Sequence, residues 1–195
     1  MTSGGDARVL ITIGAVALAA VAALAVGLWI WLRGRARRAL VARIESVSGA
    51  HISDVLLPDG NDGWFHLDFV LLTAGGLVVL DLRDVPGLVF GSEQMNEWTV
   101  IHKQRRATFP NPLGPLYDRL AVVRAIAGEG VAVEGRVVFT DRTTFPKGHP
   151  PEVLRLSSLG GELPPPIEAT LVALRPAFER VRAASTPSPR SLRRS

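Results

Sequence analysis

An uncharged stretch near the start of the chain constrains its fold more than any other feature. The 24 residues Val9–Leu32 carry no charged side chain, and Thr12 is the one clearly polar residue among them. As an α-helix this stretch would be roughly 36 Å long, enough to cross a hydrocarbon core of about 30 Å. The sequence therefore predicts a transmembrane helix over residues 9–32.

The residues that flank this stretch predict its orientation. A secretory signal peptide is the alternative, but it has a basic leading segment and a shorter apolar segment, whereas Met1–Arg8 holds one acidic and one basic residue. The flank after the stretch carries five arginines, Arg33, Arg35, Arg37, Arg38 and Arg43. Because positive residues remain on the cytoplasmic side, we expect a single-pass protein of the cell inner membrane. Residues 1–8 would be extracytoplasmic, residues 33–50 a basic juxtamembrane helix, and the rest cytoplasmic.

The charge is unevenly distributed along the chain. The whole chain has a formal net charge of +4, yet residues 46–184 hold 13 Lys and Arg against 16 Asp and Glu, a net charge of −3. Surfaces that bind nucleic acid usually carry clustered positive charge, so this distribution counts against tight binding of nucleic acid. The absence of cysteine excludes disulfide scaffolds, zinc–thiolate sites, iron–sulfur clusters and thiol catalysis.

Hydrophobic patterns predict an α/β domain over residues 51–184, with a mixed sheet flanked by helices. The expected strands are residues 51–57, 64–72, 77–85, 98–102, 131–140 and 153–156. The expected helices are residues 113–127 and 167–184, the second kinked or divided by Pro176. Residues 185–195 are rich in Ser, Pro and Arg, which predicts a disordered basic tail.

Two of these strands predict a hairpin that brings polar residues together. The residues Thr73-Ala74-Gly75-Gly76 are typical of a tight turn, and this turn places Leu72 opposite Leu77 and Asp68 opposite Asp81. One face of the hairpin is then entirely apolar: Phe65, Leu67, Phe69, Leu71, Val78, Leu80 and Leu82. The other face gathers four polar residues at one end: His66, Asp68, Asp81 and Arg83.

Two carboxylates in facing positions need a compensating partner, because like charges there are destabilising. A divalent cation is one such partner, since Mg²⁺ is held by one or two carboxylates together with water and phosphate. The alternative is an ion-pair network, with Arg83 diagonal to Asp68 and His66 diagonal to Asp81. The register favours the network but leaves both interpretations open.

A set of motifs between about Ile52 and Phe139 resembles the nuclease-related domain (NERD) family, which is grouped with the PD-(D/E)xK endonucleases. Asp68 matches the first acid of that family, and Asp81-Leu82-Arg83 stands where E-x-K is expected. Further matches are Gly87, Gly91, Trp98 and Asn111-Pro112. The resemblance implies a restriction-endonuclease-like core and cleavage of nucleic acid. It also implies that Asp68 and Asp81 hold Mg²⁺ or Mn²⁺, with Arg83 as the third catalytic residue.

Several departures from the family pattern bear on catalysis. Asp81 replaces a glutamate and so has a shorter reach, and Arg83 replaces a lysine. A guanidinium group stays protonated and cannot act as a base. Pro115 stands where the family has a glutamine, and Glu45 is the only candidate for its N-terminal glutamate. We therefore expect a NERD-like domain with degenerate catalysis; the alternative is an active Mg²⁺-dependent nuclease.

One further basic segment has two interpretations. In the first interpretation Lys103, on a neighbouring strand, takes the place of the family lysine that Arg83 has replaced. In the second, Lys103 belongs with Gln104-Arg105-Arg106 to a solvated basic turn. The second interpretation is the more common fate of such a segment.

Overall fold

The computed structural model describes residues 23–28, 40–60, 62–163 and 165–189. The chain forms two compact units, Met1–Ala42 and Arg43–Ser195. In the first unit residues 23–28 are helical. Within the described part of the chain, no helix is both long enough and apolar enough to cross a membrane. Because most of residues 9–32, and all of residues 1–8 and 33–39, lie outside the described residues, the membrane anchor stays a prediction.

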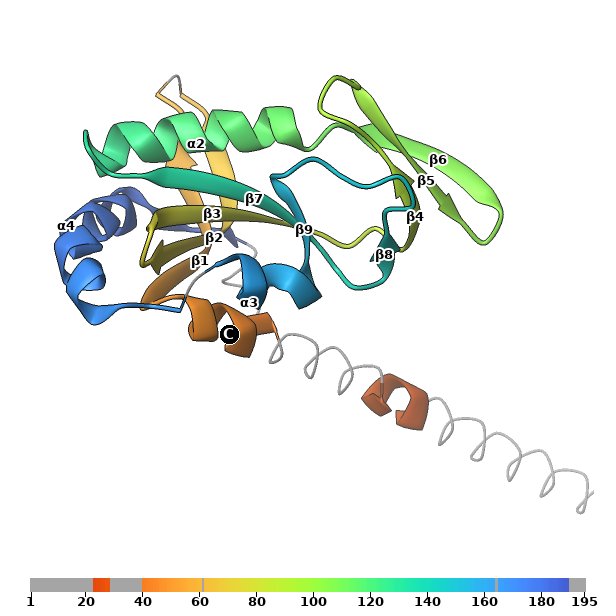
Figure 1. Ribbon diagram of the computed structural model, residues 1–195, viewed down its shortest axis with the longest axis horizontal. Coiled ribbons are helices and arrows are strands. Elements are labelled where there is room, and N and C mark those ends of the chain that lie inside the picture. The colour runs from red at the N-terminus through yellow and green to blue at the C-terminus, as the bar shows by residue number, and fades with distance from the viewer. Residues whose placement is uncertain (1–22, 29–39, 61, 164, 190–195) are drawn as a thin grey trace, which may run out of the picture. The chain divides into compact units, whose positions relative to one another are not determined.

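The second unit is built on a six-stranded sheet with the order β10-β1-β2-β3-β7-β9 (Figure 1). Its strands are β1 (Ala50–Pro58), β2 (Trp64–Thr73), β3 (Gly76–Arg83), β7 (Val133–Phe139), β9 (Val153–Arg155) and β10 (Thr186–Pro187). The pairs β10–β1, β1–β2 and β2–β3 are antiparallel, whereas β3–β7 and β7–β9 are parallel. The predicted mixed α/β architecture is confirmed.

Helices cover the central strand of this sheet. Helix α2 (Leu113–Ala127) runs alongside β7 and β3 (Figure 1), and Leu116 and Leu120 approach β7 at Gly135, where no side chain blocks them. Helix α4 (Glu168–Ala184) contacts α2 and the first three strands, while η1 (Leu156–Ser158) and α3 (Leu159–Glu162) are single turns. Six successive residues of β3, Gly76–Asp81, are buried. Since successive side chains point to opposite faces, both faces of β3 are covered.

The β2–β3 hairpin has the predicted register. Leu72 pairs with Leu77, and the ladder continues to the pair Phe69–Leu80, directly before Asp68 and Asp81. At the turn, the Thr73 hydroxyl donates a hydrogen bond to the carbonyl of Gly76 at 2.9 Å. Near the turn, the hairpin face that holds the polar residues is buried as well: Val79, on that face, has no exposed surface.

A second sheet, with the order β6-β5-β4-β8, continues from the end of β3. Its strands are β4 (Gly87–Phe90), β5 (Glu97–His102), β6 (Arg105–Pro110) and β8 (Thr143–Thr144). Of these, only β5 was predicted from the sequence. Residues 103–106 were interpreted as a turn, and Lys103 and Gln104 do form one with positive φ, but a strand begins at Arg105. Trp98 is fully buried and stacks on Phe139 at 6.2 Å, which joins the two sheets.

The domain is longer at both ends than the predicted range 51–184. Residues 40–47 are helical, Ile44 is fully buried, and the N–H of Gly49 donates to the carbonyl of Leu72. The second unit therefore includes residues 43–50, which the sequence had assigned to a juxtamembrane helix.

At the other end, β10 lies within the predicted disordered tail. It pairs with β1, whose edge offers unpaired backbone groups, and the N–H of Ser188 donates to the carbonyl of Asp54. The tail is thus ordered through Pro189, while residues 190–195 lie outside the described residues. Helix α4 continues through Pro176 as one helix, so the predicted division does not occur.

The hairpin turn generates a stability prediction. Gly76 has a φ of 137°, and a Cβ atom there would overlap the carbonyl oxygen of Ala132, whereas a Cβ at Gly75 would meet nothing within 4 Å. Gly76→Ala should lower the free energy of unfolding by about 1–3 kcal/mol, and Gly75→Ala by less than about 0.5 kcal/mol. Urea denaturation of the two full-length variants measures this difference, and equal effects would refute the turn geometry.

Candidate functional site

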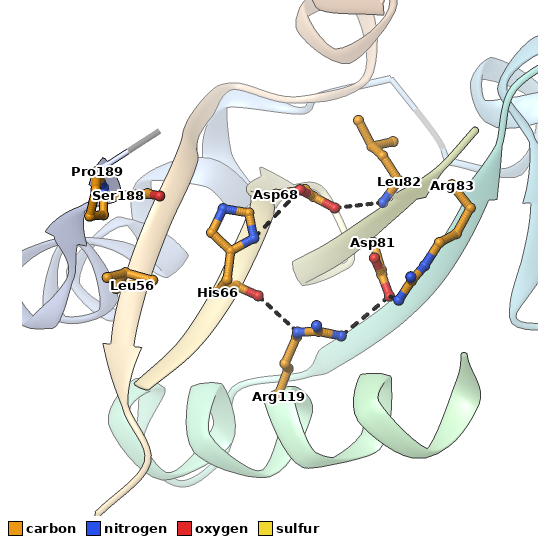
Figure 2. A pocket seen from close by; sticks show the side chains of 9 residues that line it. All are labelled: Leu56, His66, Asp68, Asp81, Leu82, Arg83, Arg119, Ser188 and Pro189. Atoms are coloured by element: carbon orange, nitrogen blue, oxygen red, sulfur yellow. Dashed lines mark hydrogen bonds and ion pairs between the residues drawn. The ribbon is translucent and has the colours of Figure 1, made fainter. Parts of the chain in front are cut away.

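Asp68 and Asp81 lie where the β2–β3 ladder ends. The Asp68 carboxylate takes the place of a backbone acceptor, because its Oδ2 accepts a hydrogen bond from the N–H of Leu82 at 2.8 Å. Figure 2 shows both aspartates at the wall of one cavity. The structure thus places the two carboxylates together, as the register of the hairpin predicted.

Asp81 is a buried carboxylate held by two arginines. Its side chain is 7% exposed, and its Oδ2 accepts hydrogen bonds from Nη2 of Arg83 at 2.7 Å and from Nη1 of Arg119 at 3.2 Å (Figure 2). Arg119 comes from α2, and its Nε also donates to the carbonyl of His66 on β2 at 2.8 Å. One guanidinium group therefore connects α2 to both strands of the hairpin.

Arg119 was not identified from the sequence. The sequence did contain a signal for Arg119, namely its spacing from apolar residues. Arg119 follows Leu116 by three residues and precedes Val123 by four, so it lies on the helix face that packs on the sheet. A charged residue at an apolar position of a buried helix face is unusual and points to a buried acidic partner.

A second set of contacts extends the site to β1. His66 Nε2 lies 2.7 Å from Asp54 Oδ1, and its Nδ1 lies 3.7 Å from Asp68 Oδ1. The pairs Ser53–Phe69 and Val55–Leu67 flank Asp54 and Asp68, so these two aspartates occupy matching positions of β1 and β2. Asp54, which has a positive φ of 54°, was also missed at the level of sequence.

The observed ion pairs differ from the predicted network. We expected Arg83 beside Asp68 and His66 beside Asp81, whereas Arg83 pairs with Asp81 and His66 lies between Asp54 and Asp68. Residues two apart on a strand share a face, so Arg83 reaches Asp81 on its own strand. An ion-pair network is present, with different partners.

Burial raises the pKa of Asp68 above its ordinary value of 3.8. The hydrogen bond from Leu82 lowers this pKa, the negative charge of Asp81 raises it, the nearby His66 lowers it, and a hydrogen bond shared with Asp81 raises it. The net effect is upward, so Asp68 holds its proton to a higher pH than a solvated aspartate does.

These side chains line a cavity of about 530 Å³. The complete lining is Leu56, His66, Asp68, Asp81, Leu82, Arg83, Arg119, Ser188 and Pro189. Two carboxylates and two guanidinium groups are among these residues. Their formal charges cancel, so the lining without His66 has a net formal charge of zero. The C-terminal residues Ser188 and Pro189 form part of the wall beside β1 (Figure 2).

In the present arrangement two arginines compete with a metal ion for Asp81. Among the described residues, no group of three or more His, Cys, Asp or Glu side chains is placed to hold a metal. Oδ2 of Asp81 is already bound by two cationic groups. Pro115 stands at the position of the family glutamine, and its backbone carbonyl accepts a hydrogen bond from Nη1 of Arg119 at 3.2 Å. Glu45 is exposed and does not line the cavity.

Comparison with protein-family models confirms the resemblance seen in the motifs. The model for the nuclease-related domain (NERD) matches residues 33–140, more than half of the chain, and this range includes Asp68, Asp81, Arg83 and Arg119. Searches of curated proteins and of solved structures gave no match.

The raised pKa of Asp68 predicts a pH dependence of stability. Because the folded state binds this proton more tightly than the unfolded state, the stabilisation is complete below pH 3.8 and is lost as the pH rises through the folded pKa. Asp68→Asn keeps an acceptor for the N–H of Leu82 and removes this titration. The variant should therefore gain stability relative to the wild type as the pH rises from about 3 to about 7, as measured by urea denaturation. A relative gain as the pH falls would contradict the assignment.

Proposed function

Because the chain belongs to the nuclease-related domain family, we propose that it is a membrane-anchored member of that family whose cytoplasmic domain no longer hydrolyses phosphodiesters. The observation that carries this proposal is the state of Asp81, whose Oδ2 is bound by Arg83 at 2.7 Å and by Arg119 at 3.2 Å. The domain then serves as a binding or scaffolding module at the inner face of the membrane.

The chemistry of Arg83 supports this proposal. Arg83 stands at the position of the family lysine, and its guanidinium group stays protonated, so it is unable to take a proton from water. It neutralises the carboxylate that would otherwise attract a cation. Removing the negative potential of Asp81 lowers the affinity for Mg²⁺, which relies on carboxylate charge to replace its tightly held waters.

The proposed anchor rests on the sequence on either side of residue 33. The uncharged stretch Val9–Leu32 is long enough to span a bilayer, and five arginines between Arg33 and Arg43 favour a cytoplasmic location for the domain on their C-terminal side. The family match begins at residue 33, directly after the proposed span.

One observation favours a second candidate function, a phosphodiesterase that depends on Mg²⁺ or Mn²⁺. Asp68 and Asp81 both line the cavity, and the negative charge of Asp81 contributes to raising the pKa of Asp68. In that case Asp68 and Asp81 would hold the cation after both arginines had left Asp81, and Arg83 would contact the scissile phosphate. Nucleic acid would be the substrate.

Metal binding separates the two candidates. We expect isothermal titration of the purified full-length chain with MgCl₂ or MnCl₂ to give the same small heats for the wild type and for Asp81→Asn. The two proteins should also leave single-stranded and duplex DNA and RNA equally intact. Binding tighter than about 1 mM that Asp81→Asn abolishes, together with cleavage that it abolishes, would establish the second candidate.

The anchor is tested separately from the site. Expressed in a bacterial host, the full-length chain should remain in the membrane fraction after alkaline carbonate extraction, and a variant lacking residues 9–32 should be released. A fluorescent protein that folds only in the cytoplasm should fluoresce when fused to the C-terminus. Extraction of the full-length chain by carbonate would refute the anchor.

A further inference from the structure

Residues 185–189, which we call the strap, form one wall of the cavity. Within the strap, β10 pairs with β1, and the next two residues, Ser188 and Pro189, line the cavity beside that strand (Figure 2). Ser188 is only 2% exposed, although every residue of the strap is a serine, a threonine or a proline. Displacement of the strap would therefore open the cavity on the side of β1.

The strap continues the polar row of the site across one more strand. By the register of β1 and β10, Ser188 lies opposite Asp54, and Asp54 occupies the position of β1 that matches Asp68 on β2. The N–H of Ser188 donates a hydrogen bond to the carbonyl of Asp54 at 3.0 Å. The strap is thus bound to the residue whose carboxylate contacts His66.

Asp54 has an unusual backbone conformation, and the strap supports it. Its φ of 54° lies in the left-handed region, which non-glycine residues rarely adopt and which persists only where surrounding contacts hold it. The N–H of Ser188 binds the Asp54 carbonyl, and Nε2 of His66 lies 2.7 Å from Oδ1 of the same residue. Once the strap leaves, the backbone of Asp54 is able to relax and to move its carboxylate away from His66.

Few contacts hold the strap in place. Strand β1 pairs with β2 over eight residue pairs, but with β10 over only two. Pro187 and Pro189 have no N–H to donate, and both are exposed, as is Thr186. The strap therefore buries no large apolar side chain. Segments with few buried apolar contacts open locally at a lower free energy than the core does, so we expect the strap to open while the domain stays folded.

We propose that residues 185–189 are an autoinhibitory strap. When closed, the strap covers the β1 side of the cavity and holds Asp54 against His66; when released, it opens the cavity and frees His66 from Asp54. A ligand that extends past the closed wall binds only the open state, so its affinity is reduced in proportion to the fraction of molecules with an open strap. The strap controls access to the cavity whether or not the cavity is catalytic.

A disulfide between β1 and β10 tests the strap directly. Leu56 pairs with Thr186, and the Cα atoms of facing residues in an antiparallel pair are about 4.5–5.5 Å apart, a distance that a disulfide spans. Because the chain has no cysteine, Leu56→Cys/Thr186→Cys introduces the only two thiols of the molecule. The same full-length variant in detergent then has a locked strap when oxidised and a free strap when reduced.

Modification of histidines by diethyl pyrocarbonate, read by mass spectrometry of peptides, measures the release of His66. Because Nε2 of His66 faces Asp54 in the closed state, we expect the reaction to proceed through the open state. The disulfide should slow the modification of His66 about fivefold or more relative to the reduced variant. Deletion of residues 185–195 should accelerate it about fivefold or more relative to the wild type, whereas deletion of residues 190–195, which keeps the strap, should not.

Two other histidines are internal controls for this experiment. His102 and His149 are exposed and do not line the cavity, so their rates of modification should be equal in all of these proteins. A rate at His66 that neither the disulfide nor the longer deletion changes would overturn the proposal. Equal changes at all three histidines would also overturn it, because they would indicate loosening of the whole domain.

Hydrogen exchange of the wild-type chain gives a second readout that needs no substitution. The N–H of Ser188, bound to Asp54, is protected only while the strap is closed, whereas Val79 lies in the buried central strand β3. The protection factor of the Ser188 amide should be lower than that of Val79 by about 100-fold or more, and the disulfide should remove most of this difference. Equal protection of the two amides in the wild type would show that the strap opens only when the domain unfolds, and would overturn the proposal.

Discussion

The buried carboxylate of Asp81 is the interaction on which the candidate site depends. A carboxylate with a side chain only 7% exposed loses most of its hydration, and an unpaired charge there would be strongly destabilising. Two guanidinium groups supply the compensation, Arg83 from the same strand and Arg119 from α2. A divalent cation would compensate the same charge, so arginine and metal are alternative partners of one carboxylate.

Arg119 gives this pairing a structural role as well as an electrostatic one. It donates to Asp81 on β3 and to the carbonyl of His66 on β2, while α2 covers the sheet through Leu116 and Leu120. The position of α2 and the charge state of the cavity are therefore coupled. A cation at Asp81 would displace Arg119, which also joins the helix to the sheet. This exchange therefore costs more free energy than the loss of one surface ion pair.

The sequence predicted the features that depend on local patterning. The register of the hairpin followed from the turn at residues 73–76, and the placement of Asp68 and Asp81 at one cavity followed from the register. Arg119 and Asp54 were missed because their partners are distant in sequence and are found only once α2 and β1 are placed. The strands β6 and β10 were missed because a polar, exposed ribbon and a two-residue edge strand have no hydrophobic periodicity.

The central claim is that Asp81 and Arg119 stabilise each other within the folded domain. A double-mutant cycle of Asp81→Asn and Arg119→Gln, with free energies of unfolding from urea denaturation of the full-length chain, measures this coupling directly. The account predicts a favourable coupling of about 1–3 kcal/mol that MgCl₂ leaves unchanged. A coupling near zero, or one that Mg²⁺ abolishes, would contradict it and indicate a site kept open for a cation.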